Sequence, residues 1–503
     1  MSSQNNRALP TEPIGALASE SMSTFRRSLT TPMITLLVVA MAAPLGSMIG
    51  NVPVGIILGN GAGLPIMFAV GGILVALAAV GYIALSRAVG RTGGFSELIR
   101  AGLGERFGRG AAYATALAYL AGTLSLAAGT GYFTSITLAG FGIDTPWYLW
   151  TGAALAIVLL LGRRGADFSS KVLFVLIAAE FALLIALDVS ILVTNGVEAL
   201  PMDVFAPQTI FSGHLGPALM IGFTSFIGIE SAIIYTREAK NPARAIPRAT
   251  FAAVGMIIVF YLVSSWLIIG SVGTADIVGV AAESEGALVF AVAGQVSGTP
   301  LVTLLQIFFC LSLLATLIAL HNATVRYVHD LSERGELPGM LSAIHRRHGS
   351  PARASDLLVG FAALLLGAFG IAGVSPYIGL GTSLTGLFTI GVIGVQAVVS
   401  VAVIVYFRRR RDRRLFATLI APALGGAGIA LATGVIAGNF AVLTGANDPI
   451  TNSLPLLFLV AIIVGAALPP RRRKADAWSA AEDPAPADLS SSATSPHTKE
   501  VAS

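Results

Sequence analysis

Two apolar stretches of this chain, APLGSMIGNVP at residues 43–53 and GFTSFIGIES at residues 222–231, are interrupted by glycine, proline and polar residues. Proline removes a backbone hydrogen-bond donor and glycine weakens a helix, so each stretch predicts a helix break. Unpaired backbone at bilayer depth survives only where it faces protein or a wet cavity. Two such breaks, five spans apart, indicate a transporter built from two inverted repeats, with its site where the broken helices meet. A kink that serves only helix packing is the alternative for either stretch.

The composition is that of a polytopic membrane protein. Hydrophobic residues make up 55% of the 503 residues and charged residues only 11%, which is more apolar than one soluble core could hide. About twelve stretches approach the roughly 20 residues that a helix needs to cross a bilayer. Segment 276–293 is expected to form an additional short helix over the outer mouth. The predicted spans are 33–59, 64–86, 111–139, 147–162, 172–193, 214–235, 250–272, 300–322, 355–372, 379–406, 415–437 and 451–469.

The basic residues predict the orientation of these spans. All 31 Lys and Arg residues fall in the termini or in alternate connections of this topology. The opposite connections, near 140–146, 194–213, 273–299, 373–378 and 438–450, contain none. Because basic connections are retained in the cytoplasm, both termini are expected on the cytoplasmic side of a cytoplasmic (inner or plasma) membrane. Topology therefore accounts for the high pI of 9.5, and the lipid bilayer, rather than nucleic acid, is the expected partner.

The sixth span and the connection after it, FIGIESA at 226–232 and KNPARAIPRA at 240–249, closely resemble the permeases of the amino acid–polyamine–organocation (APC) superfamily. Three other regions resemble the same family: GGF at 93–95 with AGLG at 101–104, ERGELP at 333–338, and GSMI at 46–49. The resemblance covers about residues 33–410. It implies the all-α fold of the bacterial leucine transporter, with about ten core helices in a 5+5 inverted repeat plus two C-terminal helices.

These observations predict four parts of the chain. Residues 1–30 form a cytoplasmic N-terminal segment, and 31–410 form the transport core of helices 1–10. Residues 411–470 carry helices 11 and 12. The cytoplasmic tail 471–503 is predicted to be disordered, because its composition, rich in Ala, Ser and Pro, cannot bury enough apolar surface to fold.

Residues at the two breaks are the candidate substrate site. The resemblance implies that the first-span break presents backbone N–H groups to a substrate carboxylate, as helix N-termini can. Met48 stands where the family has glycine, so its side chain is expected to narrow the approach or to shift the break. Tyr119 and Phe226 are candidate lids over the substrate, with core packing as the alternative. The candidate substrate-binding residues are Pro44, Gly46, Ser47, Met48, Ile49, Asn51, Tyr119, Thr224, Phe226, Gly228 and Glu230.

Carboxylates in spans five and six are candidate coupling groups, because an ionisable group in hydrocarbon is costly and marks a functional site by default. For Glu230 the resemblance implies a gate or proton-sensitive group, and capping of freed N–H groups is the alternative. Glu180 falls about where several family members have a lysine in place of a sodium ion. It is expected to bind a proton, receive a cationic group of the substrate or pair with another helix. Asp188 is expected only to border the vestibule, and His321 to be a satisfied interfacial residue.

Two hydroxyl residues of span eight, Ser312 and Thr316, are the further coupling candidates. They stand at i and i+4 on one helical face, and the resemblance implies that hydroxyls there help to hold a sodium ion. The alternative is that they bond carbonyls of their own helix. No carboxylate stands near them in span eight, so protons are favoured over sodium as the coupling ion.

The function predicted is secondary active transport of an amino acid or related amine by alternating access, proton-coupled or as an exchanger. A sensor or partner subunit could keep the same fold without transport, and a membrane enzyme is the third class. An enzyme would need convergent His, Asp or Cys residues, and the chain has six His and one Cys without such a cluster. No phosphate-binding loop is present, so ATP drive within this chain is not expected. Neither a cofactor nor a metal is expected.

Overall fold

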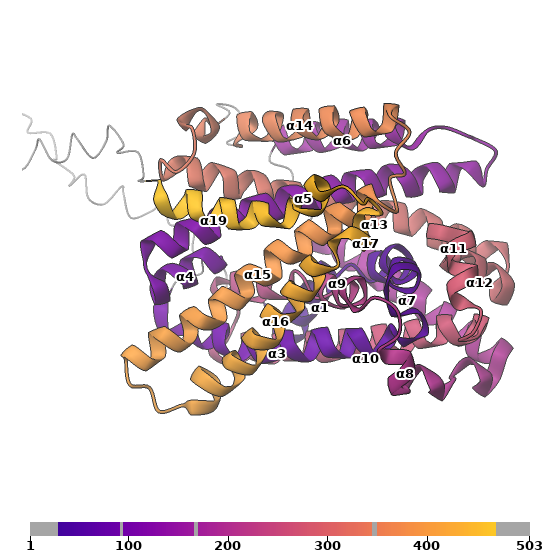
Figure 1. The fold of residues 1–503 in the computed structure, drawn as a ribbon, viewed down its shortest axis with the longest axis horizontal. Helices are drawn as coiled ribbons and strands as arrows, with labels where there is room; N and C mark the ends of the chain where they lie inside the picture. The colour runs from indigo at the N-terminus through magenta and orange to yellow at the C-terminus, as the bar shows by residue number, and fades with distance from the viewer. Residues whose placement is uncertain (1–28, 91–93, 165–169, 345–349, 469–503) are drawn as a thin grey trace, which may run out of the picture.

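The computed structural model describes residues 29–90, 94–164, 170–344 and 350–468, and these are almost entirely helical (Figure 1). The expectations for residues 1–28 and for the tail 471–503 lie outside this part of the chain. The helices are α1 (Thr31–Met41), α2 (Val52–Val54), α3 (Pro65–Val89), α4 (Phe95–Leu103), α5 (Glu105–Ala139), α6 (Trp147–Arg164), α7 (Ser170–Asn195), α8 (Pro207–Ile210), α9 (Leu215–Thr224), α10 (Pro242–Val272), α11 (Ile277–Ser284), α12 (Leu288–Ser297), α13 (Thr299–Glu333), α14 (Ala352–Ile371), α15 (Leu380–Arg409), α16 (Ala421–Gly438), α17 (Phe440–Thr444), α18 (Pro449–Asn452) and α19 (Leu457–Ala467).

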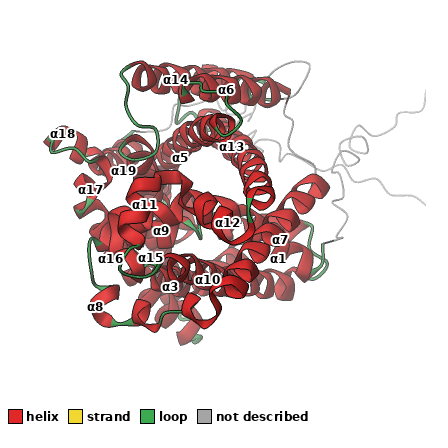
Figure 2. Cartoon of the chain, turned by 90° about the vertical axis from the view of Figure 1, so that its right-hand side faces the viewer, coloured by secondary structure: helices red, strands yellow, loops and turns green. Residues whose placement is uncertain are grey.

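The predicted all-α polytopic fold is confirmed. Within the described residues, 11 helical segments are long and apolar enough to cross a membrane. Ten of them coincide with predicted spans, and the shorter apolar helices Trp147–Arg163 and Leu454–Ala467 match the other two. The eleventh segment, Ile277–Ser297, is the region expected to form one short outer helix. It is instead the pair α11 and α12, separated by Glu285 with a φ of 45°. This pair lies across one end of the bundle, facing the viewer in Figure 2.

The first span breaks at Ala42–Ala43, at the start of the interrupted stretch 43–53. Ala43 has a φ of 44°. Proline disfavours the α conformation in the residue before it, and its own missing N–H is tolerated at the first position of a helix. Pro44 therefore ends α1 and begins the second half of the span, where Gly46–Asn51 forms a π-helical turn. The break and the π turn are separate features that the sequence does not distinguish.

The sixth span breaks between α9 and a 3₁₀ helix, Ile229–Arg237. Gly228 has a φ of 107° there, a conformation that costs glycine little and other residues much. A Cβ at Gly228 would lie 2.8 Å from Cβ of Met41, the last residue of α1. The two breaks therefore lie next to each other.

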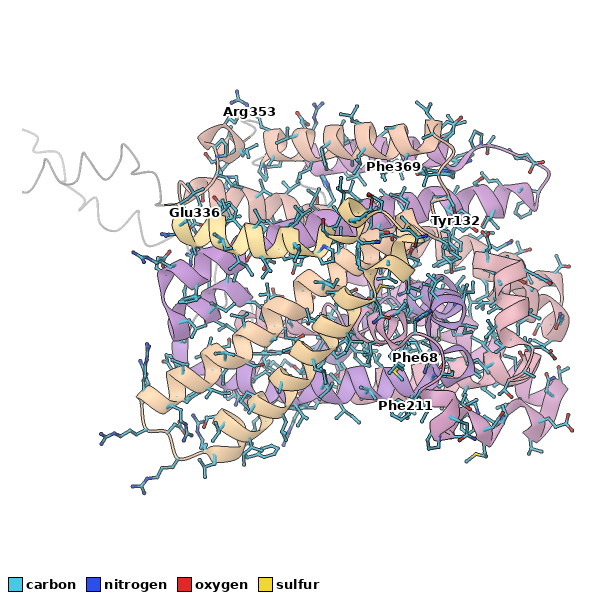
Figure 3. All side chains as sticks on the ribbon, viewed as in Figure 1. Phe68, Tyr132, Phe211, Glu336, Arg353 and Phe369 are labelled. Atoms are coloured by element: carbon cyan, nitrogen blue, oxygen red, sulfur yellow. The ribbon has the colours of Figure 1, made fainter. Side chains whose placement is uncertain are left out.

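The remaining helices surround these two. The long helix α5 packs against α6, α13, α15 and α19, while α10 packs against α1 and α3. Helices α6 and α14 form an outer layer along the top edge in Figures 1 and 2. The connections that carry basic residues gather at the end of the molecule with α4 and the α15–α16 turn, at the left in Figure 1. Arg353 marks this end in Figure 3, and Tyr132 lies toward the other.

Candidate functional site

Both breaks open onto one cavity of about 420 Å³, a size typical of small-molecule sites. Its walls come from the first span, α5, α7, α9 with the turn after it, α13 and α15. Most of the lining is apolar, and the polar groups are mainly hydroxyls together with two carboxylates. The predicted site residues on its wall are Gly46, Ser47, Asn51, Tyr119, Glu180, Thr224, Gly228, Glu230, Ser312 and Thr316.

Four of the predicted substrate-binding residues do not line this cavity: Pro44, Met48, Ile49 and Phe226. Met48 and Ile49 are fully buried in the core, because the π turn directs them away from the cavity. Phe226 packs against α3, where a Cβ at Gly72 would meet its ring at 2.7 Å. Met48 therefore does not narrow this cavity, and Pro44 stands directly after the break.

Glu180 joins three elements that are distant in sequence. The backbone N–H of Leu45, just after the first break, donates to its Oε2 at 3.3 Å. The hydroxyl of Ser312 in α13 lies beside the same carboxyl group. The Glu180 residue is only 2% exposed. The expectation that no carboxylate stands near Ser312 holds only within span eight, because folding brings one from span five.

Thr316 follows the alternative considered for it. Its hydroxyl donates to the Ser312 carbonyl of its own helix at 2.8 Å. That contact uses the hydroxyl hydrogen, and the residue also lines the cavity. Of the two span-eight hydroxyls, only that of Ser312 has a contact on another helix.

Glu230 lies directly beyond the sixth-span break. Its Oε2 accepts from the backbone N–H of Gly228 at 2.9 Å, which is the capping contact considered as an alternative to a gating role. The neighbouring Ser231 lines the cavity, is 9% exposed, and its hydroxyl has no hydrogen-bond partner. The second break thus presents a carboxylate and a free hydroxyl to the cavity.

Several polar contacts around the cavity involve partner residues that the sequence did not single out. Thr224 pairs with Thr389 of α15 at 2.5 Å, and Ser125 of α5 pairs with Thr385 at 2.7 Å. The Ala42 carbonyl at the first break accepts from Tyr261 of α10 at 3.0 Å and from Ser47 at 3.2 Å. Hydroxyls within spans three, seven and ten were the available signal, but such residues are too common in membrane helices to choose among them.

An aromatic cluster lies at the end of the cavity toward α11 and α12. Tyr132 stacks on Tyr377 with centroids 5.1 Å apart, and Phe133 contacts Phe309 at 4.7 Å. The Tyr377 hydroxyl donates to the Gly50 carbonyl of the first span at 2.8 Å. Tyr132, labelled in Figure 3, donates to Glu285 between α11 and α12 at 3.2 Å. These contacts tie the outer helix pair and the loop before α15 to the first span.

The opposite end of the cavity runs toward the basic connections, with α4 as part of its wall. Phe95, Leu98 and Tyr327 line it there. Arg100 of α4 forms an ion pair with Glu336 after α13 at 2.9 Å, and burial raises the pKa of Glu336. Tyr327 donates to Ser96 at 2.8 Å. These bonds hold α4 against the end of α13.

Asp188 and His321 do not line the cavity. Asp188 accepts from Ser264 of α10 at 2.6 Å, so it lies in a helix interface. His321 hydrogen-bonds through Nε2 to Ser355 of α14 at 2.9 Å. The described residues contain no group of three or more His, Cys, Asp and Glu side chains that could hold a metal ion.

Comparison with known proteins identifies the family. The family model described as "Amino acid permease" matches residues 30–468. The chain is 27% identical to the methylthioribose transporter of Bacillus subtilis over 80% of this chain and 86% of the relative. It is 26% identical to the branched-chain amino acid permease BcaP of the same organism over 70% and 75%. A probable GABA permease of Pseudomonas aeruginosa is 29% identical over 30% and 31%. The chain belongs to the amino acid permease family of the APC superfamily.

Family and fold together define the class of protein. It is a multi-pass membrane protein that transports amino acids or related substrates. The relatives are named as permeases and transporters, and none of those compared is named as an enzyme.

Proposed function

We propose that this protein is a secondary active transporter that moves an amino acid or related amine by alternating access and couples this movement to protons through Glu180. The observation that carries the proposal is the contact of Glu180 with Leu45 at the first break and with Ser312 of α13. A carboxyl group at this junction would gain or lose its charge between the half of the first span that follows the break and α13. Desolvation penalises the charged form, so proton loading would respond to opening of the cavity.

In this proposal the structure is an inward-facing state, in which the cavity opens toward the cytoplasm. Two features support this: the aromatic cluster around Tyr132 and Tyr377 lies at one end, and the cavity wall continues to α4 at the other. Basic connections gather at the α4 end, which supports a cytoplasmic location for that end and for both termini. In this proposal residues 31–410 form the transport core and residues 411–470 carry the two additional helices.

Sodium coupling is the competing proposal for the same junction. Ser312 is the hydroxyl that could contribute to a sodium site, and a carboxylate beside it suits a hard cation. The proton is the ion we propose, because one buried carboxyl group can carry a proton alone, whereas a hard cation needs several oxygen ligands.

The test is uptake in proteoliposomes containing the purified protein. With an imposed pH gradient and sodium-free buffers on both sides, labelled substrate should accumulate, and a protonophore should abolish this accumulation. Uptake that requires sodium and ignores the pH gradient would refute proton coupling. Binding without any flux or exchange would favour a sensor or partner subunit instead.

A further inference from the structure

A second cavity, of about 260 Å³, lies at the end of the molecule where the basic connections gather. Its walls are the end of α3, the 3₁₀ helix Ile229–Arg237 and the start of α10. Helices α3 and α10 pack against each other along the lower edge in Figure 1. Ile233 lines both this cavity and the transport cavity. An occupant of the second cavity would therefore touch the half of the sixth span that follows the second break.

The charge of this cavity favours an anion. Among its described lining residues Arg87 is the charged one. Its guanidinium donates to the Ala243 carbonyl at the start of α10, and four further N–H donors of the group remain. No carboxylate in the described part of the chain pairs with Arg87. Arg414 of the α15–α16 turn lies close enough to Arg87 for their charges to repel each other, and Arg414 itself pairs with Asp412 at 2.8 Å.

The surface beside the cavity favours a phospholipid as the source of this anion. One side of α10 is exposed, with Arg244 and Arg248 near its start and Phe251 and Val259 further along. Phe251 is 38% exposed and Val259 is 64% exposed. These positions follow the helical period, so basic side chains at headgroup level are followed by apolar ones that acyl chains can contact. The cavity is smaller than most small-molecule sites, which suits a headgroup whose acyl chains stay outside.

We propose that this cavity binds the phosphate headgroup of an anionic phospholipid, with Arg87 as the main ligand. The planar guanidinium matches phosphate oxygens, and basic pockets between membrane helices on the cytoplasmic side bind such headgroups. A bound lipid would hold the 3₁₀ helix of the sixth span against α3 and α10. The inference goes beyond the proposed transport function, and it depends neither on the substrate nor on the coupling ion.

The first experiment measures binding to the purified full-length protein by native mass spectrometry. The probes are dioleoylphosphatidylglycerol, which is anionic, and dioleoylphosphatidylcholine, which has the same acyl chains and a phosphate but no net charge. A third probe, sn-glycerol 3-phosphate, has the phosphate without acyl chains. Phosphatidylglycerol should bind at least about fivefold more tightly than either of the others. Equal binding of the two lipids overturns the proposal, and so does equal binding of glycerol phosphate, because the ligand would then be a soluble anion.

Variants test whether the cavity itself, rather than general surface charge, provides this preference. Arg87→Gln removes the charge from the wall and should weaken phosphatidylglycerol binding about fivefold or more. Ala243→Trp fills the hollow from an exposed position and keeps every charge, so it should weaken binding by a similar factor. Arg353→Gln is the matched control, because Arg353 is exposed at the same end of the molecule (Figure 3) but does not line the cavity. Its affinity should change less than about twofold.

Each variant is compared with the unmodified protein after size-exclusion chromatography shows that it is monodisperse. An equal loss of binding in Arg353→Gln and Arg87→Gln overturns the proposal, because the lipid would then respond only to net surface charge. Undiminished phosphatidylglycerol binding in either Arg87→Gln or Ala243→Trp also overturns it. Since lipid binding needs neither substrate nor a gradient, these outcomes are independent of the uptake experiment that tests proton coupling.

Discussion

The two helix breaks look alike in sequence but are held in different ways. At the first break, Glu180 accepts the freed N–H of Leu45 from 135 positions away in the sequence. At the second break, Glu230 accepts the freed N–H of Gly228 from two positions away. The first break is therefore stabilised by other helices, and the second largely by its own chain. A junction built from several helices is the one suited to sense their relative movement, whereas a locally closed turn is suited to hold a fixed shape.

The largest effect on substrate binding is expected from Gly228→Leu, which disrupts the backbone of the second break. A leucine there must adopt a φ of 107°, and its Cβ would lie 2.8 Å from Cβ of Met41. Backbone strain of about 1–3 kcal/mol, together with this overlap, should weaken substrate binding about a hundredfold or more. Calorimetry on purified protein measures this loss, while expression and monodispersity should stay largely intact.

The control for that variant is Gly255→Leu in α10, where an added Cβ has open space. It should bind substrate with normal affinity. Normal affinity in Gly228→Leu would instead remove the sixth span from the site.

The next largest effect is expected from Glu180→Gln, which neutralises the carboxylate at the first break and keeps its shape. We expect retained exchange of labelled for unlabelled substrate, with loss of uphill uptake driven by a pH gradient. The reason is that an amide cannot load or release the proton. Counterflow and gradient-driven uptake in the same proteoliposomes measure the two activities.

Glu230→Gln tests the difference between the two breaks, because the Glu230 carboxylate accepts the N–H of Gly228 at the second break. It should retain a larger share of gradient-driven uptake than Glu180→Gln. Full gradient-driven uptake by both variants would show that neither carboxylate couples transport to protons and that another group does so.

A smaller effect is expected from Tyr261→Phe, which removes one of the two donors to the Ala42 carbonyl at the first break. Loss of one hydrogen bond costs about 1 kcal/mol, or roughly a fivefold weakening of substrate binding. Combining it with Ser47→Ala should cost more than the sum of the single changes, because the carbonyl then has neither donor.

Ser265→Ala is the matched control on α10. Its hydroxyl donates to the Tyr261 carbonyl of the same helix at 2.6 Å, so its loss should leave binding nearly unchanged. Strict additivity of Tyr261→Phe and Ser47→Ala would mean that the first break does not depend on these donors together.

The smallest effect on transport is expected from single cysteine substitutions in the connections. Their labelling reports which end of the molecule faces outside. In a Cys310→Ala background, Asp144→Cys should react with a membrane-impermeant reagent in intact cells, and Met340→Cys only after permeabilisation. Both positions are exposed, and the basic connections predict this sidedness. Labelling with the opposite sidedness would invert the topology and the direction of the proposed cavity opening.

Much of the architecture could be predicted because membrane helices have strong local signals. Ten long helices and two shorter ones match the predicted spans, since length and hydropathy alone decide whether a helix can cross a bilayer. The segment Ile277–Ser297 was expected as one helix and is two, because the conformation of Glu285 divides it. The break near Pro44 was also predictable, because it lies at the start of the interrupted stretch 43–53.

Side-chain direction within the breaks was less predictable. Met48 and Phe226 were expected near the substrate, but neither lines the cavity. Met48 lies in a π turn, where the usual helical period does not tell which face a residue occupies. The family resemblance identified the right segments without fixing which residues turn inward.

The sequence by itself determined the helices, the charge asymmetry of the connections and the two stretches where helices break. The reason is that hydropathy, basic residues, proline and glycine act locally. Only the tertiary structure decided that Glu180 meets Leu45 and Ser312, that Met41 packs on Gly228, and that Tyr132 stacks on Tyr377. These contacts join positions far apart in the chain. They depend on how rigid helices pack together, and no local pattern of residues encodes that arrangement.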